Sequence, residues 1–183
     1  MKHFIFFLSC IVTLSVCSCG GGNRNETDTN DTLTLNDTLG VNEFGDSEVN
    51  GTDTIDGHVY AFKILMRADK SLETVKNSYG YEYYDNVATL IVSKDGTQIC
   101  NRSFTKKDFN DIISTQILNK TALTGLVFND NKKGSNILHF IVTIEDPDPS
   151  APTFSHYIEL KVDAQGRIST RETQDVEGES VDV

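Results

Sequence analysis

The sequence has little cysteine where a folded domain would use it. Three of its four cysteines lie within the first nineteen residues, and only Cys100 lies beyond them. A single cysteine cannot form an internal disulfide, so the folded part of the chain has to be stabilised by its hydrophobic core. This excludes the even-numbered disulfide scaffolds of small secreted proteins. At 183 residues, one domain is the expected number.

The amino terminus lacks a hydrophobic run long enough for a membrane span. Its apolar stretch from Phe4 to Val16 covers about thirteen residues, or about 20 Å as a helix at 1.5 Å per residue. A permanent span crosses a hydrocarbon core of about 30 Å and needs nearer twenty residues. With Lys2 before it, the stretch has the pattern of a signal-peptide core.

Positive charge is scarce overall, and the formal net charge is −11. Residues 20–57 contain nine acidic residues and one basic residue, and residues 174–183 contain four acidic residues and no basic one. Residues 58–173 contain fourteen of each. The acidity therefore belongs to two polar flanks, where it solvates and extends the chain. Because no basic patch is visible, the sequence predicts no nucleic-acid partner.

Motifs for catalysis, metals and cofactors are also missing. The histidines outside the amino-terminal segment, His58, His139 and His156, form no His-x-x-x-His or Cys/His spacing, so zinc is not indicated. The sequence has no Gly-x-Ser-x-Gly elbow, phosphate loop or complete calcium loop. Cys100 has no recognisable partner and is expected to be a buried thiol. We therefore predict no catalytic residue, no metal, no cofactor and no enzymatic activity.

What the sequence does contain begins at the end of the apolar run. The residues from Val16 to Cys19, Val-Cys-Ser-Cys, resemble a bacterial lipobox. The resemblance implies cleavage before Cys19 and acylation, with palmitate among the acyl groups, of its thiol and new amine. It predicts a signal peptide at residues 1–18 and a lipid anchor in the cell envelope, at either face of the outer membrane. Lipidation of Cys17 and a plain secretory signal are the alternatives.

A polar segment follows the anchor. Residues 19–57 consist largely of Gly, Asn, Asp, Thr and Glu without helical periodicity, which predicts an acidic disordered tether. Asp-Thr followed by an aliphatic residue occurs in it three times, at Thr32, Thr38 and Thr54. This pattern resembles the acceptor motif for protein O-glycosylation in Bacteroidetes envelopes, so these threonines are candidate sites. Chance occurrence in an Asp- and Thr-rich linker is the alternative.

Residues 58–173 have the pattern of a globular α+β domain, and residues 174–183 that of an acidic flexible tail. Alternating and buried apolar runs predict a mostly antiparallel sheet of about six or seven strands. Asp95-Gly96 predicts a hairpin turn between two of them.

One main helix is expected to start after Thr105 and to pack on this sheet. Thr105 can cap it, with Asp108 at the third helical position. The apolar side chains on its buried face would be Phe109, Ile112, Ile113 and Ile117. A strongly curled sheet or a small open β-barrel with a helix is the alternative fold.

Two stretches carry a second resemblance. YEYYDNVATLIVSKDG at residues 81–96, followed by FTKKDF at residues 104–109, resembles a family of unknown function among small Bacteroidetes lipoproteins. The resemblance implies an outer-membrane lipoprotein and no catalytic residues.

A cluster of tyrosines precedes the strand expected at residues 86–93. Alternation places Tyr79, Tyr81 and Tyr83 on one side of an extended segment. Tyrosine offers a large apolar area with a polar tip, so these residues are a candidate aromatic face for sugars or peptides. The alternative is a strand whose aromatic face packs on the core.

Together these features predict an uncharacterised cell-envelope lipoprotein that presents a small binding or assembly domain on a tether. Its expected partners are the membrane, through the lipid anchor, and an envelope protein or glycan; its oligomeric state is not predicted. An envelope hydrolase with residues gathered from distant positions is one alternative. An inhibitor or chaperone-like module that uses a sheet edge is the other.

Overall fold

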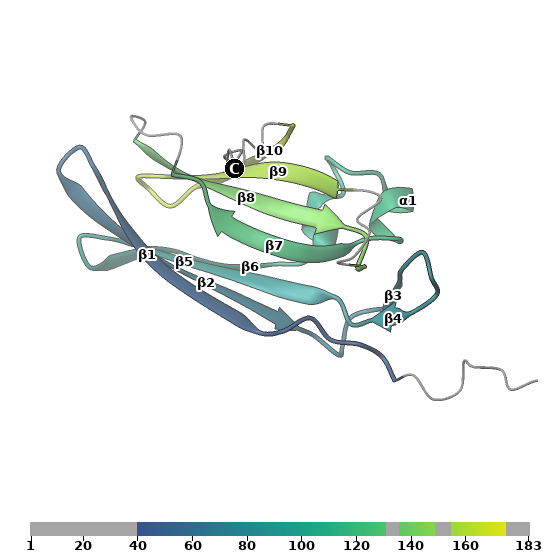
Figure 1. Cartoon of the computed structure of the whole chain (residues 1–183). Helices are drawn as coiled ribbons and strands as arrows, with labels where there is room; N and C mark the ends of the chain where they lie inside the picture. Colours follow the sequence, from purple (N-terminus) through teal and green to yellow (C-terminus); the bar gives the residue numbers. More distant parts are fainter. Residues whose placement is uncertain (1–39, 131–135, 149–154, 175–183) are drawn as a thin grey trace, which may run out of the picture. The chain divides into compact units, whose positions relative to one another are not determined.

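The first of two facing sheets comes from the amino-terminal half of the domain. The computed structural model describes residues 40–130, 136–148 and 155–174. Within these residues, four antiparallel strands form a sheet in the order β1-β2-β5-β6 (Figure 1). Their bounds are β1 Ser47–Ile55, β2 His58–Ala68, β5 Asn86–Lys94 and β6 Thr97–Phe104.

The second sheet comes from the carboxy-terminal half and lies over the first. Its four strands are also antiparallel and follow the order β10-β9-β8-β7. Both β2 and β5 contact β7, as the facing layers of Figure 1 show. The bounds are β7 Ala122–Phe128, β8 Ile137–Glu145, β9 Ser155–Asp163 and β10 Ile168–Thr173. A short hairpin of β3 Val75–Lys76 and β4 Glu82–Tyr83 forms a third, two-stranded sheet.

Alternating side chains explain why the two sheets pack face to face. One hydrophobic core joins inward residues of both sheets. Full burial of such a side chain contributes about 1.5–3 kcal/mol. On β2 the buried residues are Tyr60, Phe62, Ile64 and Met66; on β8 they include Leu138, Phe140, Val142 and Ile144. Both sets, and all the strands expected after residue 58, agree with the sequence pattern.

The expected main helix is not found in the described part of the chain, so the α+β prediction is wrong and the fold is a β-sandwich. In its place are a 3₁₀ turn, η1 Lys106–Phe109, and a single helical turn, α1 Thr115–Leu118. The predicted cap is nevertheless formed: the backbone N–H and the hydroxyl of Thr105 donate to Asp108 Oδ2 at 2.8 and 3.0 Å.

The helix stops early for reasons that are local. Asn110, Asp111 and Ser114 follow its first turn, and their short polar side chains compete with helical backbone bonds. Phe109 and Ile113 are still buried in the core. The apolar spacing therefore predicted two of the buried side chains correctly, whereas Ile112 and Ile117 are only partly buried and the buried Leu118 was not predicted.

Two Asp-Gly turns shape the first sheet. Asp95 and Gly96 have φ of 49° and 81° and join β5 to β6 as predicted. Asp56 and Gly57, with φ of 51° and 79°, join β1 to β2 in the same way. Positive φ at both residues is the mark of a type I′ hairpin. The predicted tether therefore ends too late: β1 lies inside residues 19–57 and belongs to the domain.

A buried polar cluster ties the two sheets together. Lys106 Nζ lies 3.1 Å from Asp85 Oδ2 and donates to the Thr121 carbonyl at 2.7 Å. The other carboxylate oxygen of Asp85 accepts the Leu123 N–H at 2.9 Å, and the Asn86 side chain donates to the Leu123 carbonyl at 2.8 Å. Both charged side chains are almost fully buried. Residues before β5 are thus bonded directly to the start of β7.

Candidate binding surfaces

The β3–β4 hairpin presents two exposed tyrosines. Tyr79 and Tyr81 lie in its loop and are 68% and 45% exposed. The backbone N–H groups of both residues donate to Oδ1 of Asn77, at 3.0 and 2.9 Å. Asn77 is buried, and Gly80 supplies a positive φ of 86° between the two tyrosines. The loop is therefore held in one conformation that displays both rings.

Tyr83 is placed differently. It is half-buried in β4, where its ring centroid lies 5.4 Å from that of Phe44. Burial raises the pKa of the Tyr83 hydroxyl, and the charges of Asp148 and Asp146 raise it further. The structure therefore groups Tyr79 with Tyr81 as an exposed pair and gives Tyr83 a packing contact. Strict alternation fails because Gly80 turns the chain between the first two tyrosines. The binding role of this face stays a prediction.

Residues 40–46, assigned to the tether by the sequence, run along the same hairpin. The N–H of Asn42 donates to the Glu82 carbonyl at 2.8 Å, and its carbonyl accepts the Tyr84 N–H at 2.9 Å. Two exposed ion pairs also join this segment to β2 and the residues after it: Glu43 with Lys70 and Asp46 with Arg67. Exposed ion pairs contribute at most about 1 kcal/mol each to stability. The ordered domain therefore begins before β1.

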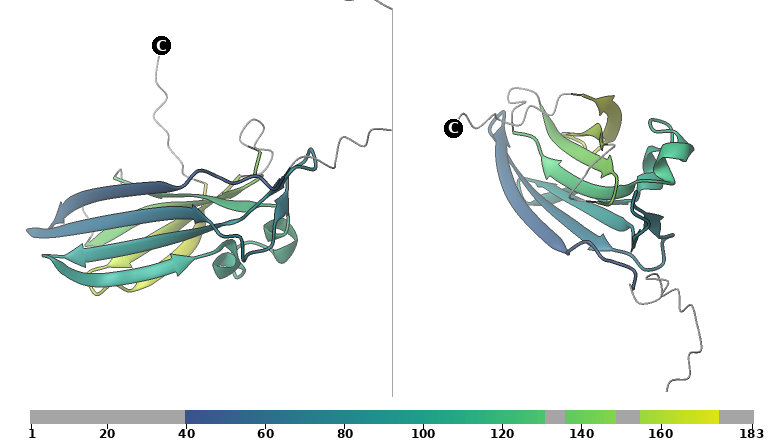
Figure 2. Two further views of the ribbon diagram at one scale, coloured as in Figure 1. Left: turned by 90° about the horizontal axis from the view of Figure 1, so that it is seen from below. Right: turned by 45° about the vertical axis from the view of Figure 1, so that its right-hand side comes forward.

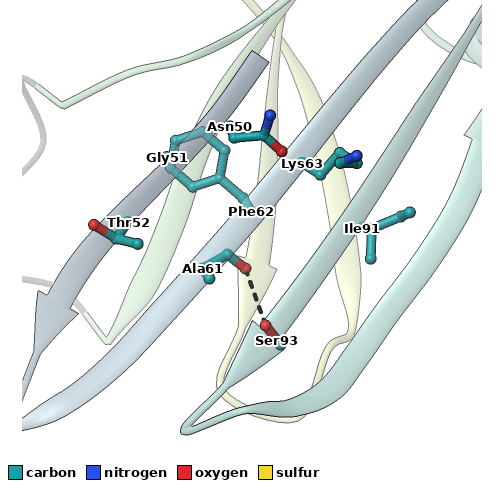
Figure 3. Close-up of a pocket in the computed structure, with 8 residues that line it drawn as sticks. All are labelled: Asn50, Gly51, Thr52, Ala61, Phe62, Lys63, Ile91 and Ser93. Atoms are coloured by element: carbon teal, nitrogen blue, oxygen red, sulfur yellow. Dashed lines mark hydrogen bonds between the residues drawn. The ribbon is translucent and has the colours of Figure 1, made fainter. Parts of the chain in front are cut away.

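A hollow of about 470 Å³ lies on the outer face of the first sheet, beside β1 (Figure 3). Small side chains at Ala61 and Ser93 create it, and the Ser93 hydroxyl donates to the Ala61 carbonyl at 3.5 Å. At its rim, Lys63 Nζ lies 2.5 Å from a Glu48 oxygen. The lining residues are Asn50, Gly51, Thr52, Ala61, Phe62, Lys63, Ile91 and Ser93. They offer hydroxyl, amide and apolar contacts rather than a nucleophile beside a base.

The three histidines do not form a joint site. The β8–β9 register places His139 opposite Lys161 on the outer face and His156 opposite Ile144 on the inner face. They project from opposite faces of the second sheet. Each histidine is paired with a carboxylate: His58 with Asp95 at 2.6 Å, His139 with Glu159 at 2.9 Å and His156 with Glu172 at 3.4 Å.

Sequence reasoning missed the carboxylate of Glu159, which is 0% exposed on the outer face of β9. Besides His139, it contacts Arg171 Nε and, at 3.3 Å, Lys161 Nζ. A buried carboxylate requires such cationic partners, because desolvation without them costs several kcal/mol. Only the strand register brings these residues together, so spacing along the chain carried no signal for them.

The remaining predicted residues divide between the described and undescribed parts of the chain. Cys19, Thr32 and Thr38 lie outside the described residues. Thr54 is exposed near the end of β1, so this candidate acceptor belongs to the folded domain rather than to a tether. Cys100 is buried, as predicted, and burial raises the pKa of its thiol.

Two further kinds of feature, metal-ligand clusters and membrane-spanning helices, are absent from the described residues. The described ranges hold no group of three His, Cys, Asp or Glu residues that could bind a metal ion. No helix within them has the length and hydrophobicity needed to cross a membrane.

Comparison with known families identifies the domain. A family model described as a domain of unknown function, DUF4738, matches residues 27–170. The matched range includes β1, both sandwich sheets as far as β10 and the Tyr79–Tyr81 loop. No curated protein matches the chain.

Proposed function

The chain belongs to the DUF4738 family, and from this premise we propose that it is a lipid-anchored protein of the cell envelope whose sandwich binds a partner without catalysis. In this proposal residues 1–18 are a signal peptide and Cys19 carries the acyl chains, as in outer-membrane lipoproteins of the Bacteroidetes type. The binding surface is the loop that displays Tyr79 and Tyr81, and its ligand is a glycan of the envelope.

The observation that carries the binding role is the fixed exposure of two aromatic rings. Tyr79 and Tyr81 are large side chains at 68% and 45% exposure, yet their backbone is fixed by the buried Asn77. Because the loop is ordered before a ligand arrives, little conformational entropy is lost on binding. A tyrosine ring stacks on the apolar face of a sugar while its hydroxyl remains available for a hydrogen bond. At the base of the loop, Lys76 Nζ and Glu82 Oε1 lie 3.0 Å apart and add polar groups to this surface.

Binding can be measured by calorimetry with purified envelope polysaccharides and their oligosaccharides. The paired change Tyr79→Ala and Tyr81→Ala should weaken binding by roughly tenfold or more, since each stacked ring contributes about 0.5–1.5 kcal/mol. The matched pair Tyr79→Phe and Tyr81→Phe keeps both rings and should retain most of the affinity. A glycan that binds both pairs equally well would show that the loop is not the site. If the loop bound an envelope protein and no glycan, the ligand in this proposal would be a protein instead.

The anchor has its own test. Native protein taken from membranes should have the mass of a chain that begins at Cys19 and carries acyl groups. Cys19→Ser should leave a soluble or unprocessed protein, whereas Cys17→Ser, two residues away, should be acylated normally. Acylation that survives Cys19→Ser but is lost with Cys17→Ser would move the anchor to the other cysteine.

We also propose that Thr32, Thr38 and Thr54 carry O-linked sugar, which would shield the chain from proteolysis. Of these, Thr54 is exposed at the end of an edge strand, where an attached sugar would not disturb the core. The mass of native protein should exceed that of a variant with alanine at all three positions by more than the three substitutions account for. Identical masses after that correction would reject modification.

A further inference from the structure

The sandwich has four edge strands, and three of them carry features that discourage pairing with another chain. The ladder between β5 and β6 is irregular at Val92 and Ser93, and the ladder between β7 and β8 is irregular between Leu123 and Gly125. β10 is only six residues long and contains adjacent charges at Arg171 and Glu172. Bulges, short length and charges are the devices by which natural proteins protect sheet edges.

β1 is the exception. It extends over nine residues and pairs with β2 in an unbroken register from Ser47 to Ile55. It contains no proline or lysine, and among the described residues no strand lies on its other side. Figure 2 shows it as the outermost strand of the first sheet. Long, regular and exposed edges of this kind are templates for adding a further strand.

Both faces of β1 are accessible as well as its edge. Val49, on the side that faces the second sheet, is 49% exposed, and Asn50 and Thr52 are exposed on the opposite side beside the hollow. Its two acidic side chains differ: Glu48 is paired with Lys63, whereas Asp53 accepts the backbone N–H of Thr54. A neighbouring strand would therefore meet few uncompensated charges.

We propose that β1 pairs with β1 of a second copy of this chain, antiparallel and centred on Gly51. Full overlap of nine residues then places Glu48 opposite Thr54 and Val49 opposite Asp53, so no like charges face each other. A two-fold rotation axis maps this register onto itself, as an isologous dimer requires. The axis is normal to the joined sheet, which becomes one continuous sheet of eight strands.

The second copy is favoured over an unrelated peptide by this self-complementarity. A partner strand with an acidic residue opposite Glu48, or with large side chains at every position, would lose the match that β1 has with itself. The pairing uses one strand per copy, so its area is below that of a standard stable interface and the association should be weak and reversible. The inference does not depend on the tyrosine loop, because β1 is not part of that loop.

The first experiment uses the purified full chain without attached sugar, because a sugar on Thr54 would lie beside Glu48 of the second copy. Its mass is measured in detergent by sedimentation across a concentration series. A monomer–dimer equilibrium is expected. Changing Asn50→Lys and Thr52→Lys together places lysine opposite lysine twice across the axis and should raise Kd by at least about tenfold. Both positions are exposed, but position 50 lies opposite Lys63 within the monomer, so thermal unfolding has to show that the variant keeps its fold. The control is Val127→Lys, a 54% exposed position on the β7 edge, which should leave Kd unchanged.

The second experiment tests the register in membranes. Cysteines at positions 50 and 52 of one chain, Asn50→Cys with Thr52→Cys, should form an oxidised dimer on a non-reducing gel, with the unchanged chain as background. Thr54→Glu should weaken the dimer because it faces Glu48, whereas Thr54→Lys should not.

Three results would overturn the inference. These are a monomer at all concentrations, a dimer lost with Val127→Lys instead, and a dimer indifferent to the changes at positions 50 and 52. Glycan binding by the tyrosine loop can succeed or fail independently in the same preparations.

Discussion

The two long sides of the sandwich are built differently. On one side the β9–β10 turn lies directly against β6, and a methyl group at Gly166 would stand 1.9 Å from the Ile99 carbonyl oxygen. On the other side β1 projects, with Val49 49% exposed and Gly51 covered mainly by the ring of Phe62. The closed side is tightly packed at Gly166, whereas on the open side no strand among the described residues pairs with the outer edge of β1. The side where packing is tightest and the side available for binding are therefore different sides of the domain.

On the closed side, Gly166→Ala should be the most destabilising of these substitutions. The new methyl group would collide with backbone, which cannot rotate away, and the residue also has a φ of 78°. We expect a loss of more than about 4 kcal/mol in the free energy of unfolding, measured with urea. Gly96→Ala is the matched control, because that turn glycine has a φ of 81° but open space around it. It should lose only about 1–2 kcal/mol. Equal losses would contradict the tight contact at Ile99.

The buried link between the sheets should be nearly as sensitive. Lys106→Met leaves the carboxylate of Asp85 buried without its cation, which should cost about 3 kcal/mol or more. Lys107→Met, on the neighbouring residue, removes only an exposed pair with Glu73 and should change the free energy of unfolding by less than about 0.5 kcal/mol. Chemical unfolding of both variants checks the difference. A small effect at Lys106 would show that the cluster is not needed to hold the two sheets together.

The open side should tolerate change better, but not at Gly51. A methyl group there would lie 2.2 Å from the tip of the Phe62 ring, which is stacked on Phe128 with centroids 4.6 Å apart. Gly51→Ala should therefore destabilise the protein by about 1–3 kcal/mol, as overpacking does. Gly45→Ala, with no atom within 4 Å, should have almost no effect. If the two variants melt at the same temperature, the ring is free to move and the open side is looser than described.

The smallest expected effect concerns the two Asp-Gly turns at the end of the first sheet. Hydrogen bonds from His58 and from the Val59 N–H lower the pKa of the Asp95 carboxyl. A lowered pKa adds stability that is present above the unfolded value of 3.8 and is lost as pH falls through the folded value. Asp95→Asn should therefore flatten the loss of stability below about pH 4. Unfolding curves of both proteins, measured at about every pH unit between pH 2 and pH 7, would give the slope of the free energy of unfolding against pH. An unchanged slope would remove Asp95 as its source.

Much of the fold was predictable from local pattern. The long strands β2 and β5 to β10 follow alternating or buried apolar runs, and Asp95-Gly96 indicated its hairpin because both residues accept positive φ. The same dipeptide at Asp56-Gly57 carried no such signal, because β1 before it has only Val49 and Ile55 as apolar residues and no regular apolar alternation. The helix expected after Thr105 does not form, although its cap and part of its apolar spacing are present, because the short polar side chains of Asn110, Asp111 and Ser114 compete with helical backbone bonds after the first turn.

The candidate surfaces were predictable only in part. The tyrosines stood out by composition, yet their separation into an exposed pair and a packed Tyr83 depends on Asn77 and on the positive φ of Gly80. Neither Glu159 nor the Asp85–Lys106 pair had any signal in sequence spacing, because the fold brings their partners in from separate elements of the chain.

The sequence by itself determined which long segments could be strands, which side chains in them had to leave water and where the Asp95-Gly96 turn could form, since these follow from nearest neighbours along the chain. Only the tertiary structure decided that the strands divide into two facing sheets, that β1 belongs to the domain and that its outer edge remains open. These features depend on which strands pair across long separations, and the free energy of that pairing is shared by residues that are neighbours in space alone.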